Sequence, residues 1–218
     1  MVSETNRHEV LSVRDLGSGA YVLRMERKGL EFEAGQYIHV GPLPGIDRRE
    51  YSVYSPTGED CLEILVKEVP AGSVSPRLRR LAPGDRVDVE GPFGFFRLEP
   101  GRDESAPLLF LATGTGISPF HCLAGSHPGL NYRLIHGVRT AEERYDHDAY
   151  PSDRVVACVS REDGGDFRGR VTDWLREHPA PPDAMVYLCG NSDMIYEAYG
   201  LLGEQGITSD RIFAEVYF

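Results

Sequence analysis

Four consecutive residues, Arg49, Glu50, Tyr51 and Ser52, bring a cation, a phenol and a hydroxyl together on one short segment. In an extended strand, alternation places Arg49 and Tyr51 on the same face, with Ser52 at the end. A guanidinium suits a pyrophosphate, a tyrosine ring can lie against an isoalloxazine, and a hydroxyl can hydrogen-bond flavin N5. The segment therefore indicates a flavin site, although an ordinary strand explains the same four residues.

Two turns in the second half of the chain have the composition of nucleotide-binding turns. Residues 113–119, Thr-Gly-Thr-Gly-Ile-Ser-Pro, follow an apolar run and open a helix, where bare amides and the helix dipole can bind a pyrophosphate. Cys189-Gly190-Asn191 follows another apolar run. Glycines after a strand are common in any α/β protein, and a buried Cys189 with a core Met194 explains the second turn equally well.

A third turn, residues 71–76, reads Ala-Gly-Ser-Val-Ser-Pro and follows an apolar strand candidate. Glycine permits close backbone approach, and the amides at the following helix start could bind a flavin phosphate. Ser75 is also a good helix N-cap, so both interpretations can hold together.

The first hundred residues have the pattern of short strands separated by Gly, Pro and Asp turns, which favours a small antiparallel barrel or sandwich. A short helix is predicted at Ser75–Leu81, with Pro76 in its first turn and Pro83-Gly84 after its end. The predicted strands are Tyr21–Met25, Tyr37–Val40, Tyr51–Tyr54, Leu62–Val69 and Arg86–Glu90.

The pattern changes after the polar linker Glu99–Pro107, so we predict two domains, residues 1–102 and 103–218. Beyond the linker, apolar runs alternate with helix-length stretches, which indicates βαβ units and a doubly wound parallel sheet. The predicted strands are Leu108–Ala112, Asn131–Gly137, Arg154–Val159 and Met185–Cys189, and the predicted helices are Ser118–Ala124, Val171–His178 and Asp193–Glu204.

Composition excludes several classes of protein. The chain has 218 residues and a formal net charge of -11, which argues against nucleic acid or an anionic membrane surface as a partner. No apolar run approaches the length of a bilayer span, and the N-terminus lacks an export signal, so we expect a cytoplasmic protein. The four cysteines lack the spacing of a zinc or iron–sulfur site, and we expect no metal and reduced thiols.

The order of these pieces is more specific than any one of them, and together they resemble the ferredoxin–NADP reductase family over nearly the whole chain. Within it, the chain is most similar to bacterial ferredoxin or flavodoxin reductases. The resemblance implies a flavin-binding β-barrel followed by a nicotinamide-dinucleotide domain. It rests on Arg49–Ser52, Gly72–Ser75, Gly91–Gly94, Gly114–Pro119, Cys189–Asn191 and Ala214–Phe218.

The resemblance implies FAD as the bound flavin. It places Arg49 on the pyrophosphate, Tyr51 against one isoalloxazine face and Ser52 near N5, with Tyr217 over the opposite face and Phe218 on the adenine. Packing of the aromatic tail into a surface groove is the alternative. The implied FAD residues are Arg49, Tyr51, Ser52, Val66, Gly72, Val74, Ser75, Thr115, Tyr217 and Phe218, and the implied catalytic residues are Ser52, Cys189, Glu215 and Tyr217.

NADP is the implied nicotinamide cofactor. Ser160, Arg161 and Arg170 follow a predicted strand and could hold a 2'-phosphate, where an NAD site would offer a carboxylate. Glu162, Asp163 and Asp166 lie between the arginines and could pair with them or repel the phosphate. The predicted NADP residues are Gly114, Gly116, Ser160, Arg161, Arg170, Gly190, Asn191 and Met194.

The leading hypothesis is a monomeric enzyme that moves hydride between NADPH and FAD and single electrons between FAD and a ferredoxin or flavodoxin. Such partners are acidic, so docking would need a locally basic face, which first-half arginines could supply unless they are simply solvated. The alternative is an NAD(P)H-dependent flavin reductase or a reductase component feeding an oxygenase. A flavin-binding regulatory subunit is a third possibility. The arginines are Arg48, Arg77, Arg79, Arg80 and Arg86.

Overall fold

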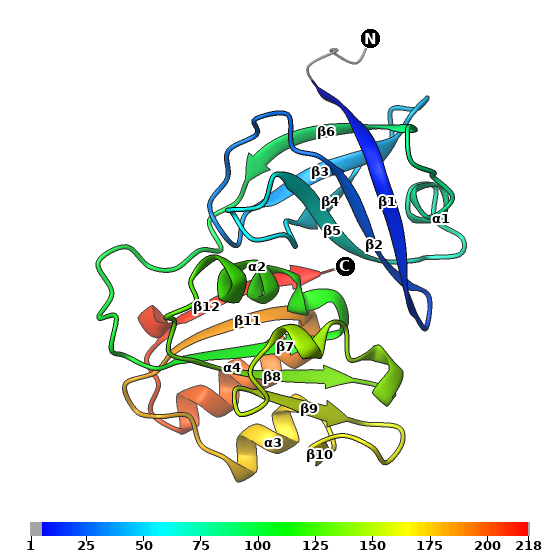
Figure 1. The fold of residues 1–218 in the computed structure, drawn as a ribbon. Helices are drawn as coiled ribbons and strands as arrows, with labels where there is room; N and C mark the ends of the chain where they lie inside the picture. The colour runs from blue at the N-terminus through cyan, green and yellow to red at the C-terminus, as the bar shows by residue number, and fades with distance from the viewer. Residues whose placement is uncertain (1–5, 218) are drawn as a thin grey trace. The chain divides into compact units, whose positions relative to one another are not determined.

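A computed structural model describes residues 6–217, which divide into two compact units (Figure 1). The first unit extends to Arg97 and takes in His121–Ser126, and the second contains Leu98–Phe120 and the chain from His127 onward. No helix in the described range is long and apolar enough to cross a membrane. Each unit is built around its own sheet.

The first unit is an antiparallel barrel in the strand order β4-β3-β6-β1-β2-β5. An antiparallel bridge between Val53 and Ile64 joins the end of β4 to β5, so the two outer strands of the sheet also meet. The elements are β1 (Arg7–Gly17), β2 (Ala20–Glu26), β3 (Tyr37–Pro42), β4 (Arg49–Ser52), β5 (Cys61–Lys67), α1 (Ser75–Arg79) and β6 (Arg86–Phe93).

Local residue chemistry explains the turns of this barrel. The hairpin between β1 and β2 closes through Ser18 and Gly19, both with positive φ, at 46° and 75°, as a tight turn that follows the strand twist requires. Pro76 occupies the start of α1, where its missing N–H costs nothing. These are the turn and helix signals that the sequence carries.

The second unit is a parallel sheet in the order β10-β9-β8-β7-β11-β12, as predicted for a doubly wound domain (Figure 1). Its strands are β7 (Leu108–Thr113), β8 (Tyr132–Val138), β9 (Val155–Val159), β10 (Phe167–Arg168), β11 (Met185–Asn191) and β12 (Ile212–Tyr217). Its helices are α2 (Ser118–Ser126), which continues into the first unit, α3 (Val171–Glu177) and α4 (Ser192–Glu204). Single-turn 3₁₀ helices are η2 (Gly114–Ile117), η3 (Ala141–Glu143), η4 (His147–Ala149) and η5 (Ser209–Arg211).

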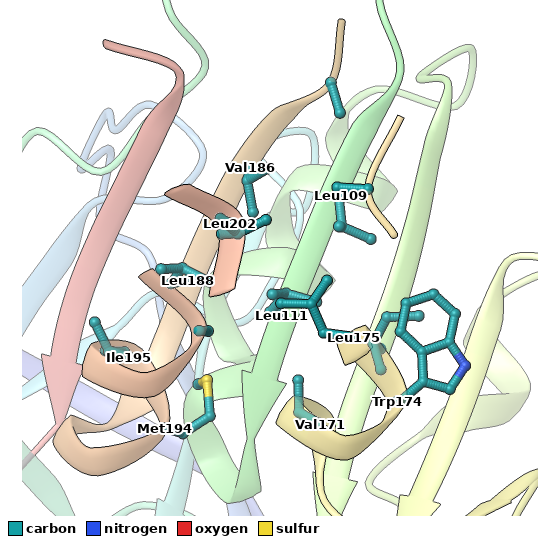
Figure 2. Packing of buried hydrophobic residues seen from close by; sticks show 14 of the residues in the cluster. Leu109, Leu111, Val171, Trp174, Leu175, Val186, Leu188, Met194, Ile195 and Leu202 are labelled. Carbon is teal, nitrogen blue, oxygen red and sulfur yellow. The ribbon is translucent and has the colours of Figure 1, made fainter. Parts of the chain in front are cut away.

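Alternate residues of the central strands pack against α3 and α4 in the core of the second unit (Figure 2). Leu109 and Leu111 of β7 lie on this face, and Val171 and Leu175 of α3 pack there. Phe110 points to the other face, where its ring stacks on Phe120 with centroids 4.6 Å apart. Because β7 is buried on both faces, its sequence is a continuous apolar run, and this run is the pattern that predicts the strand.

The predicted fold class is confirmed, with differences at particular strands. The sequence prediction missed β1, β10 and β12, and placed the strand of Arg49–Ser52 two residues late, at Tyr51–Tyr54. β1 alternates weakly because charged residues interrupt it, and β10 has two residues. The predicted helix at Ser75–Leu81 ends earlier, at Arg79.

Candidate functional site

Arg49 and Tyr51 share a face of β4, as the sequence predicts. The Arg49 side chain is exposed, and Nη1 of its guanidinium donates a hydrogen bond to the carbonyl of Arg48 at 2.7 Å. The other N–H groups of the guanidinium can therefore bind an anion. Tyr51 is half-buried, and burial raises the pKa of its phenol to about 12, so the ring stays neutral and can lie against an aromatic ligand. Ser52, at the end of the strand, is 3% exposed.

Glu50 lies on the opposite face of β4. Its carboxylate is 3.4 Å from Nε2 of His39 on the neighbouring strand β3, where the two residues are register partners. This carboxylate therefore stays clear of the face that carries Arg49 and Tyr51, where it would repel a pyrophosphate.

The turn before α1 is held by Ser75 in two ways. Its hydroxyl accepts a hydrogen bond from the backbone N–H of Val69 at 3.0 Å, and its carbonyl accepts one from the Tyr21 hydroxyl at 2.6 Å. The Gly72 N–H donates to the Val69 carbonyl at 2.7 Å, which tightens the same turn. Ser75 thus begins the helix rather than capping it, because Val74 is the N-cap residue.

Sequence reasoning missed Tyr21 as part of this turn. Its ring is fully buried and its hydroxyl reaches across 54 positions of sequence to Ser75. A tyrosine amid an apolar strand was the available signal, since a buried phenol must find a partner. Val66 and Val74 are buried, at 1% and 2% exposure, and FAD contacts at Val66, Gly72 and Val74 stay predictions.

In the second unit, the two glycine turns pack directly against each other. A Cβ on Gly116 would lie 2.3 Å from the carbonyl oxygen of Cys189, and one on Gly190 would lie 2.4 Å from Oγ1 of Thr113. Oγ1 of Thr113 also accepts a hydrogen bond from the Asn191 N–H at 2.9 Å. Gly116 and Gly190 therefore have a packing reason to be glycine, whatever they also bind.

Gly114 has a different environment. Its φ is +54°, in the left-handed region, and no heavy atom lies within 4 Å of the position where a Cβ would stand. A backbone with open space on that side can be approached closely by a ligand. Asn191 caps α4, its side-chain oxygen accepting from the N–H of Asp193 at 3.0 Å and of Met194 at 3.3 Å.

Cys189, Glu215 and Tyr217 come together on the neighbouring strands β11 and β12. Cys189 and Glu215 are register partners, and Tyr217 pairs with Asn191 two positions on. Burial raises the pKa of the Cys189 thiol well above its usual value, the Glu215 charge adds to this, and a hydrogen bond with Tyr217 opposes it. The sulfur is thus a neutral thiol, suited to positioning a ligand rather than to nucleophilic attack.

The three carboxylates between Arg161 and Arg170 have other partners. Glu162 accepts from the Ala141 N–H at 2.7 Å and Asp166 from the Ala157 N–H at 2.8 Å. Asp163 lies 3.2 Å from a nitrogen of Arg168. Within residues 6–217, no carboxylate forms an ion pair with Arg161 or Arg170, and both side chains are exposed.

Some predicted site residues have other surroundings. The Met194 side chain is 8% exposed and lies in the apolar core of the second unit (Figure 2), so its packing explanation holds for the side chain. The Ser160 hydroxyl donates to the Val138 carbonyl at 3.1 Å, leaving its lone pairs to accept. NADP contacts at Met194 and Ser160 and the FAD contact at Thr115 stay predictions, and Phe218 lies outside the described residues.

Two arginines of the predicted docking face are already neutralised. Arg48 pairs with Asp88 and Glu90, and Arg79 pairs with Asp15 and Glu68. Each cluster carries one arginine against two carboxylates, so neither is a basic patch that would attract an acidic protein.

The four cysteines are buried free thiols. Among residues 6–217, no three His, Cys, Asp or Glu side chains gather as metal ligands would.

Comparison with known proteins gives one family description for each half of the chain. Residues 9–98 match the model of an oxidoreductase FAD-binding domain, and residues 110–199 match that of an oxidoreductase NAD-binding domain. The first match runs from β1 to β6 of the barrel, and the second runs from β7 into α4 and leaves out β12 of the parallel sheet.

Among similar proteins, ferredoxin–NADP reductase B of Sorangium cellulosum is 33% identical over 95% of this chain and 96% of its own length. The reductase subunit of an aromatic O-demethylase from Amycolatopsis is 32% identical over 95% of this chain and 68% of its own. A ferredoxin–NADP⁺ reductase structure from Neisseria gonorrhoeae with bound FAD and NADP shares the fold, at a TM-score of 0.88 and 24% identity, covering 97% of this chain and 98% of that one.

Proposed function

Because this chain belongs to the ferredoxin–NADP reductase-like family of FAD- and NAD(P)-binding oxidoreductases, we propose that it transfers hydride between NADPH and FAD and single electrons between FAD and a ferredoxin or flavodoxin. FAD, when bound, supplies the chemistry that couples a two-electron hydride to one-electron steps. The protein's contribution is to bind and orient the two dinucleotides and to exclude side reactions.

The observation that carries the NADPH assignment is the state of Arg161 and Arg170. Both are exposed, and the acidic residues between them bond to backbone amides or to Arg168 instead. A guanidinium without a carboxylate partner can take a 2'-phosphate, which NADPH carries and NADH lacks. The left-handed, open Gly114 turn fits the pyrophosphate of the same ligand.

On the flavin side, Arg49 would hold the FAD pyrophosphate, Tyr51 would lie on the isoalloxazine and Ser52 would hydrogen-bond near N5. The exposed Arg49 fork and the neutral, half-buried Tyr51 ring fit these roles. Cys189 and Glu215 would orient the nicotinamide. The Tyr217 ring would cover the flavin and would move aside when the nicotinamide binds.

An anaerobic titration of the purified yellow protein tests the proposal. Addition of NADPH should bleach the flavin band at stoichiometric concentration, and NADH should require a large excess. A colourless protein that binds no flavin, or a flavin that neither nucleotide reduces, would refute the enzyme assignment. Chromatography of the released cofactor should identify FAD. FMN has no adenine, so finding FMN instead would rule out stacking of Phe218 on an adenine ring.

A second candidate is a reductase that supplies electrons to an oxygenase or to free flavin. Two observations favour it: the similarity to the aromatic O-demethylase reductase subunit, and the neutralised Arg48 and Arg79 on the face expected to dock an acidic partner. NADH preference in the same titration, with poor cytochrome reduction through added ferredoxin, would decide for this candidate.

A further inference from the structure

A buried histidine holds the first glycine of the nucleotide turn. His136 lies on β8 with no exposed surface, and its Nε2 is 2.8 Å from the carbonyl oxygen of Gly114. A carbonyl can only accept, so Nε2 carries the proton and donates. Gly114 is the left-handed residue at which η2 begins.

A second histidine completes the arrangement. Nδ1 of His136 is 2.8 Å from Nε2 of His147, which lies on η4 in the connection between β8 and β9. A neutral imidazole with its proton on Nε2 has a lone pair on Nδ1, so His147 donates to His136. Two hydrogen bonds thus run in series from η4 through β8 to the glycine turn.

The surroundings keep both rings neutral. Burial lowers the pKa of His136 to about 3, aided by His147, and burial and Arg144 lower that of His147 to about 4, against the opposing charges of Asp148 and Asp166. The aromatic rings facing the pair are those of Tyr145, 6.1 Å from His136, and Tyr150, edge-on to His147. Burial raises the pKa of the Tyr145 phenol, so this group carries no charge near neutral pH.

The planarity of the peptide makes this bond directional. The Gly114 carbonyl and the Thr115 N–H belong to one trans peptide and point in opposite directions. A carbonyl held against His136 therefore turns the Thr115 N–H away from the interior. A side chain that only filled the space at position 136 would leave this peptide held by the short η2 turn alone.

We propose that His136 and His147 are positioning residues for the pyridine nucleotide, acting through the Gly114 carbonyl to set the orientation of the phosphate-binding turn. The inference rests on the proposed function, because it assumes that this turn binds the nucleotide. It adds a requirement for a donor at position 136, which the glycines alone do not predict.

The test compares two substitutions in the FAD-loaded protein. His136→Leu keeps volume and removes the donor, whereas His136→Gln places an amide N–H near the position of Nε2. His136→Leu should raise the Kd for NADP⁺ and the KM for NADPH by up to about tenfold, as expected when the turn loses one hydrogen bond that orients it, while kcat for dye reduction changes little. His136→Gln should restore most of the affinity, and His147→Leu should have a smaller effect than His136→Leu.

His178→Leu is a control in which a histidine that bonds to a backbone carbonyl is lost from an exposed position of the same unit. His178 follows α3, stacks on Trp174 and bonds to a backbone carbonyl, as His136 does, yet it is not connected to the glycine turn. It should lower stability and leave the Kd for NADP⁺ unchanged. A wild-type Kd in His136→Leu, or a His136→Gln variant as weak as His136→Leu, would overturn the proposal.

Hydrogen exchange separates this inference from the proposed function. Amides of residues 114–117 should exchange faster in His136→Leu than in the wild type, with or without nucleotide. Unchanged exchange would overturn the positioning role. If the wild-type protein bound no NADP⁺ while exchange still increased, the nucleotide assignment would fail and the hydrogen-bond series would stand as a structural device alone.

Discussion

The backbone N–H of Asn191 donates a hydrogen bond to Oγ1 of Thr113 at 2.9 Å, across 78 positions of sequence. These residues end β11 and β7, two neighbouring strands of the parallel sheet. The bond joins the two turns that carry the predicted nucleotide residues, and it exists because parallel strands end at the same edge of a sheet.

Replacing Thr113 with valine should loosen both turns. The substitution keeps shape but removes the acceptor of the Asn191 N–H, which should cost about 1–2 kcal/mol of unfolding free energy and raise the KM for NADPH. Thr172→Val is the control, because its hydroxyl bonds to Glu197 between helices. Urea unfolding and steady-state kinetics measure both quantities, and an equal KM change in the two variants would contradict the prediction.

Replacing Arg161 and Arg170 with alanine should affect one nucleotide selectively. Each loss should raise the KM for NADPH by roughly tenfold or more, the scale of a lost charge-assisted bond, and leave that for NADH almost unaltered. Arg168→Ala is the matched control, since Arg168 pairs with Asp163. Equal effects on NADPH and NADH would rule out 2'-phosphate recognition.

Tyr21→Phe should weaken flavin binding. Without its hydroxyl, the Ser75 carbonyl loses a 2.6 Å hydrogen bond in a buried place, and the turn that it holds becomes less ordered. We expect the Kd of FAD to rise about fivefold to tenfold, measured by flavin fluorescence on dilution. Tyr187→Phe, which removes a hydroxyl bonded to the Glu99 N–H in the second unit, should retain flavin like the wild type.

Arg48→Ala should act on stability and leave docking unaffected. Asp88 is 2% exposed and would lose its cation, so the unfolding free energy should drop by about 2–4 kcal/mol. The KM for an added ferredoxin should hold steady in Arg48→Ala, whereas it should rise in Arg80→Ala, whose side chain is exposed. A ferredoxin effect confined to Arg48→Ala would restore this residue to the docking face.

Acid should destabilise the second unit through its histidine pair. Burial lowers the pKa of His136 to about 3 and that of His147 to about 4, whereas the pKa of a histidine in the unfolded chain is 6.5. Between these pH values the unfolded state therefore binds more protons than the folded state does. Stability is therefore full above pH 6.5 and is lost as the pH falls toward 4, by up to about 1.4 kcal/mol per pH unit for each histidine.

Urea unfolding of the wild type and of His147→Leu between pH 7.5 and 4.5 measures this loss. The variant should show the shallower decline, because one of the two titrating rings is gone. Parallel curves for the two proteins would mean that other groups, such as the carboxylates, account for the acid sensitivity.

The sequence by itself determined the fold class and the elements on which the predicted site residues lie. Strand and helix periodicity and the Pro76 helix start are local signals, so they can be recognised without knowing what packs against them. The same holds for the alternation that puts Arg49 and Tyr51 on one face of β4. Family resemblance then indicated FAD and a nicotinamide nucleotide, and both domain matches agree.

Only the tertiary structure decided which polar groups find partners. Glu162 and Asp166 do not pair with Arg161, because their carboxylates accept hydrogen bonds from backbone amides of η3 and β9. The neutralisation of Arg48 and the bond from Tyr21 to Ser75 also join distant segments. Hydrogen bonds and ion pairs act over a few ångströms in space, and sequence spacing does not reveal which side chains folding brings that close. The donor role of His136 is of the same kind, because it exists only where β8 lies beside β7.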